Sequence, residues 1–333
     1  MSVYSDLKNI LANNNSFILT THVNPDGDAI GSVMAMYLIL KKLDKQVRVI
    51  NYSPTPYFLS FLDPENIIEL FNPERHSAPI RDADVFIAID FNTPSRLSRM
   101  GEEFSKRAGI NVCIDHHQNP QPVFQHLFVD TSLSATGHIL YNFIEDTKIV
   151  EIDYDIAVNL YTAIMTDTGS FRFERTTPEV HHIAAKLIEI GVSPVKVFAA
   201  VYDQNTPGKL SLLSEALASI RLYGENNEVG VMVVTAGSLN RYGIDEADTE
   251  GFVNFIMSLA SVRIGVKFIE LAKGCKVSLR SKGKIPVNEL AAKYGGGGHI
   301  NAAGIRLREN KYTDVFEQVI QDAIEMIKMN GVK

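Results

Sequence analysis

The sequence predicts an α/β protein with two domains, an N-terminal domain built on a parallel sheet and a smaller C-terminal α/β domain. Its length of 333 residues exceeds the size at which one hydrophobic core usually keeps growing. In the first half, short apolar runs alternate with helical or irregular stretches, which is the pattern of a parallel sheet. A mainly helical middle separates these runs from a second group of strands.

The strands of the first domain are predicted from apolar runs that end in turns or polar residues. These runs cover residues 16–22, 47–51, 85–90 and 112–114. Residues 28–42 have the apolar content of a buried helix, so the first run, a loop and this helix form one unit. Acidic residues stand at the end of the run at 85–90 and directly after 112–114.

The domains are predicted to cover residues 1–195 and 215–333, joined by a helical linker or hinge at 196–214. The pattern is mainly helical over residues 155–218, and Asn, Pro and Gly within 202–209 mark the hinge. Beyond Gly224 the expected elements are strands at 229–235, 266–271 and 276–280, a segment at 287–294 and a closing helix at 313–329.

Composition limits the functional classes. Apolar residues make up 45% and charged residues 21% of the chain, as in ordinary globular proteins. No run approaches the roughly 18 apolar residues of a membrane span, and the start lacks the features of a signal peptide, so we expect a cytoplasmic protein. Cys113 and Cys275 are far apart and predict neither a disulfide framework nor a zinc site. The net charge of −7 argues weakly against a long nucleic-acid track.

Residues 21–32 (THVNPDGDAIGS) place one histidine and two aspartates directly after a predicted strand. In an open parallel sheet, ligands bind beyond the carboxyl ends of the strands, so His22, Asp26 and Asp28 are expected to project into a site. Two other interpretations stay open at this point. Asp28 could cap the following helix, and Asp26-Gly27 could be a plain turn.

Three further segments strengthen the metal interpretation. Asp90 ends one apolar run, Asp115-His116-His117 follows another, and Asp167 lies in an apolar helix where an unpaired carboxylate would be costly. Four aspartates and two histidines together supply four negative charges, which two divalent cations would balance. The predicted ligands are His22, Asp26, Asp28, Asp90, His116 and Asp167. Carboxylates mixed with imidazoles suit Mn²⁺, with Mg²⁺ or Co²⁺ as alternatives.

Two segments of the second domain are candidates for anion binding. Residues 295–304 (GGGGHINAAG) allow backbone N–H groups to approach an anion closely, and His299 could donate a hydrogen bond or stack on a base. Residues 276–284 place Arg280 and Ser281 at a strand end, where arginine can grip a phosphate through two hydrogen bonds. A mobile hinge and a solvated basic loop are the respective alternatives.

The ordered set of motifs resembles the DHH phosphoesterase superfamily over nearly the whole chain. The motifs are His22-x-x-x-Asp26-x-Asp28, Asp90, Asp115-His116-His117, Asp167 and the glycine run ending at His299. Within that superfamily the chain resembles the nano-RNase branch, which combines oligoribonuclease and 3′-phosphoadenosine-5′-phosphate phosphatase activities and carries a DHH-associated C-terminal domain. The resemblance implies an active site in the cleft between two domains.

The resemblance also implies roles for individual residues. One metal would be held by His22, Asp26 and Asp90, and the other by Asp28, Asp90, His116 and Asp167, so that Asp90 bridges the pair. Asp115 would steady the histidines and His117 would face the substrate phosphate. Together with Asp90 and His116, these two are the predicted catalytic residues. The predicted substrate contacts are His117, Arg172, Arg263, Arg280, Ser281, Gly297, Gly298 and His299.

The expected reactions are hydrolysis of very short oligoribonucleotides to mononucleotides and of 3′-phosphoadenosine 5′-phosphate to AMP and phosphate. The expected partners are therefore these small substrates, with no long duplex nucleic acid and no membrane, and a homodimer is plausible. An exopolyphosphatase or pyrophosphatase and a phosphodiesterase for linear or cyclic dinucleotides are the enzymatic alternatives. A nucleotide sensor without catalysis is a further alternative, against which the intact ligand set speaks. The remaining histidines are expected to be structural or on the surface: His76, His126, His138, His181 and His182.

Overall fold

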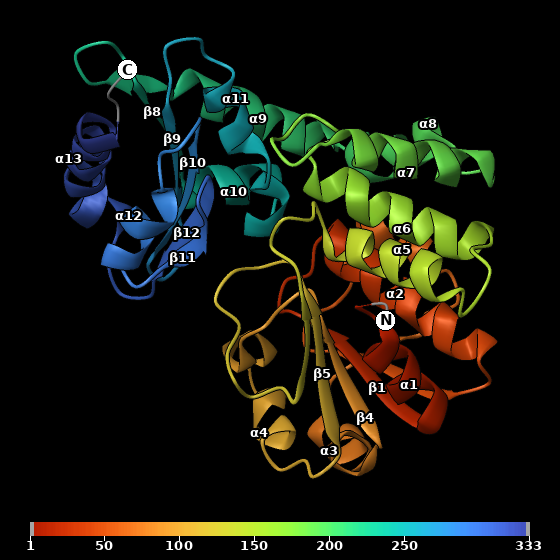
Figure 1. The fold of residues 1–333 in the computed structure, drawn as a ribbon. Helices are drawn as coiled ribbons and strands as arrows, with labels where there is room; N and C mark the ends of the chain where they lie inside the picture. Colours follow the sequence, from red (N-terminus) through yellow and green to blue (C-terminus); the bar gives the residue numbers. More distant parts are fainter. Residues whose placement is uncertain (1–2, 331–333) are drawn as a thin grey trace. The chain divides into compact units, whose positions relative to one another are not determined.

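The computed structural model describes residues 3–330 and forms two compact units that meet between Gln204 and Asn205 (Figure 1). This point lies inside the stretch 196–214 that we predicted to join the domains. The helix at Pro194–Tyr202 packs against the first unit, and the helix at Pro207–Ala218 packs against the second. Within residues 3–330, no helix is long and apolar enough to cross a membrane.

The first unit alternates strands and helices. Its strands are β1 (Ser16–Thr21), β2 (Gln46–Asn51), β3 (Ile68–Leu70), β4 (Val85–Ile89), β5 (Ile110–Asp115) and β6 (His126–Val129). Its α-helices are α1 (Ser5–Asn13), α2 (Gly27–Lys42), α3 (Pro73–Asp82), α4 (Met100–Phe104), α5 (Thr136–Thr147), α6 (Tyr154–Asp167), α7 (Pro178–Glu189) and α8 (Pro194–Tyr202), with short 3₁₀ turns η1 (Tyr57–Leu62) and η2 (Pro94–Leu97).

The strands form one parallel sheet in the order β3-β2-β1-β4-β5-β6, which confirms the predicted fold class. The order of the strands reverses between β1 and β4. In open sheets of this kind, the loops leaving two such strands diverge and open a crevice at their carboxyl ends. The sequence motifs that follow β1, β4 and β5 therefore meet at one edge of the sheet.

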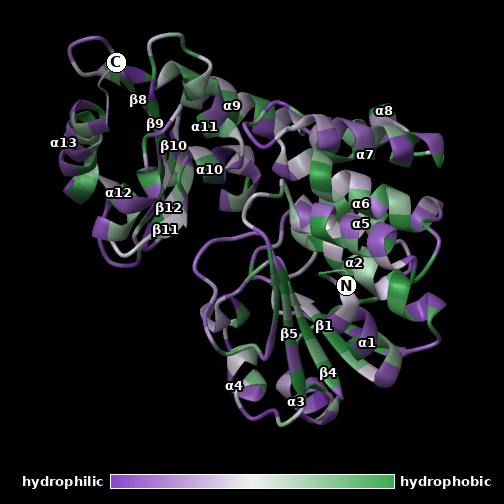
Figure 2. Ribbon diagram, viewed as in Figure 1, coloured by the Kyte–Doolittle hydropathy of each residue, from purple (hydrophilic) through white to green (hydrophobic). Residues whose placement is uncertain are grey.

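Alternating residues of each strand face two different cores. In β1, Phe17 and Leu19 contribute to a core with α1, α2, α5, α6 and α7, whereas Ile18 faces the core formed with α3 and α4. Both faces of the sheet are covered, and β4, which is wholly apolar, has the hydrophobic colour in Figure 2. β1 and β5 are apolar in their middle and carry the polar residues Thr20, Thr21 and Asp115 at their carboxyl ends.

Close packing of α2 against α6 brings the start of one helix to the end of the other. A Cβ atom at Gly31 would lie 2.5 Å from the carbonyl oxygen of Asn159, so only glycine permits this approach. Asp28 lies in the first turn of α2 and Asp167 is the last residue of α6. The helix pair thus places two carboxylates near the carboxyl ends of the strands.

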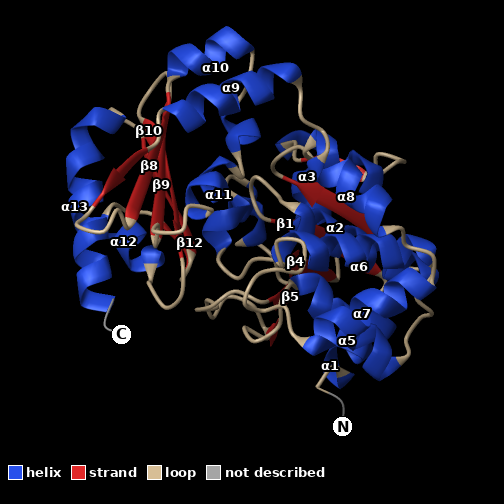
Figure 3. Ribbon diagram, turned by 90° about the horizontal axis from the view of Figure 1, so that it is seen from above, coloured by secondary structure: helices blue, strands red, loops and turns tan. Residues whose placement is uncertain are grey.

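The second unit is a mixed sheet covered by helices on both faces. Its strands are β7 (Arg221–Tyr223), β8 (Val229–Val234), β9 (Ile264–Glu270), β10 (Cys275–Ser281), β11 (Gly297–His299) and β12 (Ala302–Leu307), in the order β11-β12-β10-β9-β8-β7. Its helices are α9 (Pro207–Ala218), α10 (Ala236–Tyr242), the 3₁₀ turn η3 (Glu246–Thr249), α11 (Phe252–Met257), α12 (Val287–Lys293) and α13 (Tyr312–Asn330). Figure 3 shows α13 and α11 on opposite sides of these strands.

The glycine-rich segment is part of this sheet and not a mobile hinge. Gly297, Gly298 and His299 form β11 and pair with β12. Gly298 has a φ of +145°, and a Cβ atom there would lie 2.4 Å from the carbonyl oxygen of Ala302. Glycine is therefore required at this position because the two backbones approach each other so closely.

Candidate metal centre

The first ligand set combines residues that follow β1 and β4. The Nε2 atom of His22 lies 3.4 Å from Asp90 Oδ2 and 4.0 Å from Asp26 Oδ2. His22 and Asp90 are buried, whereas Asp26 is half exposed at the rim. One potential ligand atom from each of the three residues lies within 4.8 Å of the others, which is close enough to surround one cation.

The second ligand set combines residues from α2, the end of β5 and the end of α6. His116 Nε2 lies 3.7 Å from Asp28 Oδ2 and 3.3 Å from Asp167 Oδ2. Asp28 and His116 are almost completely buried. The sheet and the packing of α2 against α6 thus bring together three side chains that are far apart in the sequence.

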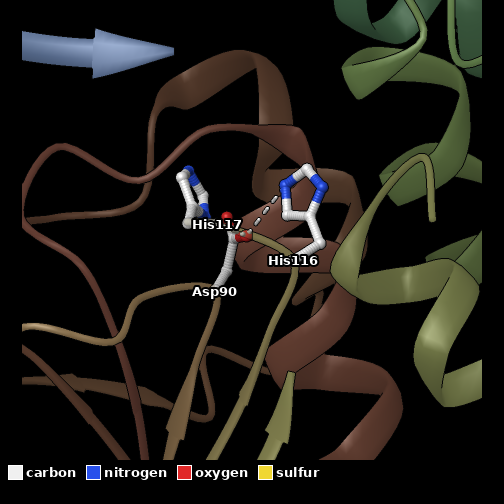
Figure 4. Close-up of side chains that lie close together, drawn as sticks. All are labelled: Asp90, His116 and His117. Carbon is white, nitrogen blue, oxygen red and sulfur yellow. Dashed lines mark ion pairs between the residues drawn. The ribbon is translucent and has the colours of Figure 1, made fainter. Parts of the chain in front are cut away.

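Asp90 connects the two sets. Its Oδ1 atom lies 3.7 Å from His116 Nε2 (Figure 4). Its Oδ2 atom lies 3.4 Å from Nε2 of His22. The backbone of Asp90 has a φ of +66°, a left-handed conformation that non-glycine residues rarely adopt and that clusters at functional sites. Thr136 Oγ1 donates a 2.8 Å hydrogen bond to Asp90 Oδ1. The carboxylate is therefore held where two neighbouring cations could share it.

Asp26, and not Asp28, caps helix α2. Asp26 accepts a hydrogen bond from the backbone N–H of Ala29. Asp28 turns toward the interior instead and accepts hydrogen bonds from the backbone N–H groups of Thr136 (2.7 Å) and Gly137 (2.9 Å) at the start of α5. The alternative interpretation of Asp28 as a simple cap of its own helix is therefore wrong.

The carboxylates of the cluster have too few cationic side chains around them to balance their negative charge. Burial, followed by the nearby Asp26, raises the pKa of Asp28 to about 6. Burial and then the carboxylate of Asp28 raise the pKa values of Asp90 and Asp167 well above their usual range. Asp167 also sits at a helix C-terminus, where the helix dipole disfavours a negative charge. Divalent cations would compensate these carboxylates, so the donor set fits metal ions.

Asp115 organises the two histidines that follow it. Its Oδ1 atom accepts a hydrogen bond from the backbone N–H of His116 (2.9 Å) and lies 2.6 Å from Nδ1 of His117. Asp115 is fully buried, and His117 is about one quarter exposed. Burial raises the pKa of Asp115, but the hydrogen bond and charge of His117 more than offset this, so that the net pKa is lowered. Asp115 is therefore ionised and orients the His117 ring.

Two arginines lie in the segment after Asp167. Arg172 is exposed and stacks over Phe173, with 5.6 Å from its guanidinium carbon to the ring centre. Arg175 was not among the predicted residues, yet its guanidinium lies 3.2 Å from Nδ1 of His116. No spacing rule marks Arg175 in the sequence, because its position depends on the irregular chain between α6 and α7.

The predicted substrate contacts of the second unit do not all share one face. Arg280 and His299 both stand opposite Ala302 across the sheet, so they point to the same side. Ser281 points to the other side, and its hydroxyl donates to the carbonyl of Ile285. Arg263 is paired with Glu228 at 3.6 Å and lines a cavity of about 210 Å³ beside α13. The structure therefore separates Ser281 and Arg263 from Arg280.

Other predicted roles are structural. His76 and His138 are buried and bonded to neighbouring protein groups, as expected of packing histidines. Cys113 and Cys275 are buried free thiols.

Comparison with known proteins now identifies the family. Residues 16–164 match the DHH family, N-terminal domain, and residues 226–329 match the DHHA1 domain. The chain is 33% identical to the bifunctional oligoribonuclease and PAP phosphatase NrnA of Thermus thermophilus, over 94% of this chain and 90% of that protein. The chain belongs to the DHH family.

Two further relatives are similar to this DHH protein over most of its length. NrnA of Bacillus subtilis is 28% identical over 87% of this chain and 88% of its own length. A solved structure of an exopolyphosphatase-related protein from Bacteroides fragilis superimposes with a TM-score of 0.90 at 29% identity, covering 97% of this chain and 96% of that one. The predicted resemblance to the nano-RNase branch is confirmed, and the protein is a hydrolase of phosphate ester bonds.

Proposed function

We propose that this DHH phosphoesterase uses two divalent cations to hydrolyse very short oligoribonucleotides to mononucleotides and 3′-phosphoadenosine 5′-phosphate to AMP and phosphate. The observation that carries the proposal is the meeting of two ligand sets at Asp90. The names of the Thermus thermophilus and Bacillus subtilis relatives support this choice of substrates.

His22, Asp26 and Asp90 would hold one cation. The other would be held by Asp28, Asp90, His116 and Asp167. This mixture of carboxylates and imidazoles without thiolates favours Mn²⁺, with Mg²⁺ or Co²⁺ as alternatives. When bound, such a pair of cations supplies a hydroxide near neutral pH and stabilises the charge that develops on the phosphate oxygens.

The chain's own residues position the substrate and the proton. Asp115 fixes the His117 ring through Nδ1, and an imidazole held in this way can donate a proton or hydrogen bond through Nε2. On this basis we propose that Nε2 of His117 donates a hydrogen bond to an oxygen of the substrate phosphate. Thr136 holds Asp90, and the N-terminus of α5 holds Asp28, so neither carboxylate must reorganise during the reaction.

In the second unit, Arg280, His299 and the backbone of Gly297 and Gly298 would bind the terminal phosphate and base of the substrate. Burial lowers the pKa of Arg280, and among residues 3–330 it forms no ion pair with a carboxylate. Glu250 favours the charge of Arg280 from beyond ion-pair distance, so a bound anion would still add a direct partner for this half-buried cation. Arg172 in the first unit remains a proposed phosphate contact.

The test is Mn²⁺-dependent hydrolysis of a matched panel, compared as kcat/KM. The panel contains ribonucleotides of two to five units, a 24-residue RNA, 3′-phosphoadenosine 5′-phosphate, linear diadenylate and polyphosphate. We expect the shortest RNAs and the bisphosphorylated adenosine to turn over fastest.

The name of the Bacteroides fragilis relative is the reason for the polyphosphate sample. If polyphosphate is the best substrate, the metal-dependent chemistry stands but the proposed nucleotide contacts of Arg280 and His299 are wrong. If no substrate is hydrolysed and the purified protein contains no metal, the sensor alternative is favoured over the enzyme.

A further inference from the structure

One face of the second sheet carries four cationic side chains. Ser278 of β10 stands opposite Lys267 of β9, and Lys276 stands opposite Arg306 of β12. Because residues at i and i+2 of a strand share a face, Lys276, Ser278 and Arg280 point to the same side as Lys267 and Arg306. We call this side, which is the side away from α13, the basic face.

The four cations of the basic face are not equally available to a ligand. Lys276 and Arg306 both contact Oε1 of Glu246, at 3.2 and 2.7 Å. Arg280 contacts no carboxylate within ion-pair distance among the described residues. Glu246 therefore offsets part of the charge at one end of the basic face, whereas at the other end Arg280 is influenced by Glu250 but forms no ion pair with it.

A buried lysine, Lys267, holds the short turn that carries Glu246 above this face. Glu246 begins the 3₁₀ turn η3 and Thr249 ends it, and residues three apart in a 3₁₀ helix lie on the same side. Lys267 is only 3% exposed, and its Nζ donates to the backbone oxygen (2.6 Å) and hydroxyl (3.0 Å) of Thr249. The turn is thus anchored through Thr249 independently of the charge on Glu246.

We propose that Glu246 limits the length of the oligonucleotide that the protein accepts. Arg280 lies four positions after Lys276 in β10, which corresponds to about 13 Å along the strand. A single strand whose end is bound at Arg280, and which continues along the basic face, would next meet Lys276 and Arg306. Since these two cations share the carboxylate of Glu246, additional phosphates gain less binding energy there than from unpaired cations.

This inference rests on the proposed function, because it concerns which oligonucleotides the same face selects. It assigns Glu246 a role in specificity and none in catalysis. The carboxylate acts on longer substrates only, so its removal should leave the shortest substrates unaffected.

The decisive variant is Glu246→Gln, which keeps the shape of the side chain and removes its charge. We expect kcat/KM for RNAs of five to ten nucleotides to rise by about 10-fold, while that for dinucleotides changes by less than about two-fold. Binding of the longer RNAs should also become more sensitive to salt, by about 0.7 in the logarithmic slope for each released cation.

Asp245→Asn is the matched control, since Asp245 is the exposed neighbouring carboxylate and makes no ion pair among residues 3–330. It should leave the length profile unchanged. Adding Lys276→Gln to Glu246→Gln should remove most of the gain, because Lys276 is one of the cations that Glu246 releases.

A second variant keeps the test decisive if Glu246→Gln does not fold. Lys276→Gln alone leaves Glu246 with one partner fewer, and we expect longer RNAs to be hydrolysed at least about three-fold less efficiently relative to dinucleotides. An unchanged length profile in folded protein, with an unchanged melting temperature, would overturn the inference for either variant.

Binding of labelled, hydrolysis-resistant RNAs to the Mn²⁺-loaded protein, measured by anisotropy, separates this failure from failure of the proposed function. If the wild-type protein binds no oligonucleotide of any length, the proposed function is wrong. If the wild-type protein prefers short RNAs and Glu246→Gln shows the same preference, only the role of Glu246 is wrong.

Discussion

The two units of this protein bury opposite charges. In the first unit, Asp28 and Asp90 are buried beside further carboxylates, and their pKa values are raised by burial and by that crowding. In the second unit, Lys267 is buried on a face that also carries Arg280, and burial lowers the pKa values of both. Burial therefore disfavours negative charge in the first unit and positive charge in the second unit.

This difference favours ligands of opposite charge for the two units. The carboxylates of the first unit are stabilised by cations, and the basic face of the second unit is stabilised by anions. Bound metal ions would supply the positive charge that the carboxylates lack, and the phosphates of a substrate would supply the negative charge that the basic face lacks. Substitutions in each unit and removal of metal test this opposite distribution of buried charge, and the largest effect is expected in the first unit.

Replacement of Asp90 should have the largest effect. Asp90→Ala removes the carboxylate that connects both ligand sets, so we expect kcat/KM to fall by about 10³-fold or more. Activity and metal content should be measured together, with Asp82→Asn, an exposed carboxylate on α3, as the control. Substantial activity with normal metal content in Asp90→Ala would refute the assignment of Asp90.

Removal of metal should destabilise the first unit. Cations that bind the folded protein only, at about 1,000 times their dissociation constant, add about 4 kcal/mol to the free energy of unfolding. We therefore expect a chelator to lower the melting temperature and Mn²⁺ to restore it. The same treatment of Asp90→Ala should produce a much smaller change, and equal changes in both proteins would contradict the proposed site.

Arg280→Ala should weaken substrate binding in the second unit. Hydrogen bonds to charged groups contribute about 1.5–3 kcal/mol, which corresponds to about a 10- to 100-fold increase in KM with a smaller change in kcat. Arg308→Ala, which removes an exposed arginine after β12, is the control. If both variants behave like the wild type, Arg280 does not contact the substrate.

The smallest expected effect is a pH dependence of the free energy of unfolding that arises from Lys267. Burial, then Lys276 and Arg280, lowers the pKa of Lys267 to about 7, while Glu250 and Glu246 oppose this shift. Above this pH the folded lysine is neutral, whereas the unfolded one takes up a proton. Stability should therefore rise by about 1.4 kcal/mol for each pH unit above 7, until the unfolded lysine also loses its proton.

Lys267→Met should remove this slope while preserving the volume of the side chain. The measurement is urea denaturation of both proteins at pH 7.5 and 8.5. Identical slopes in the two proteins would mean that Lys267 keeps its proton in the folded state.

Much of the fold and of the metal centre could be predicted because the relevant signals are local. The apolar runs and the aspartates and histidines that follow them indicate a parallel sheet with a polar edge, and the helix at 28–42 begins within one residue of α2. The strands β3, β6, β7, β11 and β12 were not predicted. β3, β7 and β11 have three residues and β6 has four, which is too short a pattern to indicate a strand, and β12 (AAGIRL) begins with small residues that do not favour strands.

The remaining site residues depend on tertiary contacts that leave no pattern in the sequence. The donors to Asp28 are backbone N–H groups of Thr136 and Gly137, which any residue could supply. The contact of Arg175 with His116 depends on an irregular loop. Ser281 is different, because the alternation of side chains along β10 already places it on the face opposite to Arg280.

The bonds from α5 to Asp28 have a practical consequence. Thr136 and Gly137 donate their amide protons directly to the carboxylate of Asp28, and Thr136 also holds Asp90 through its hydroxyl. The nuclear magnetic resonance signals of these two amides will therefore change whenever the charge at the centre changes. Two backbone positions that perform no chemistry thus provide a spectroscopic reporter of cation occupancy, readable without substrate and without altering any ligand.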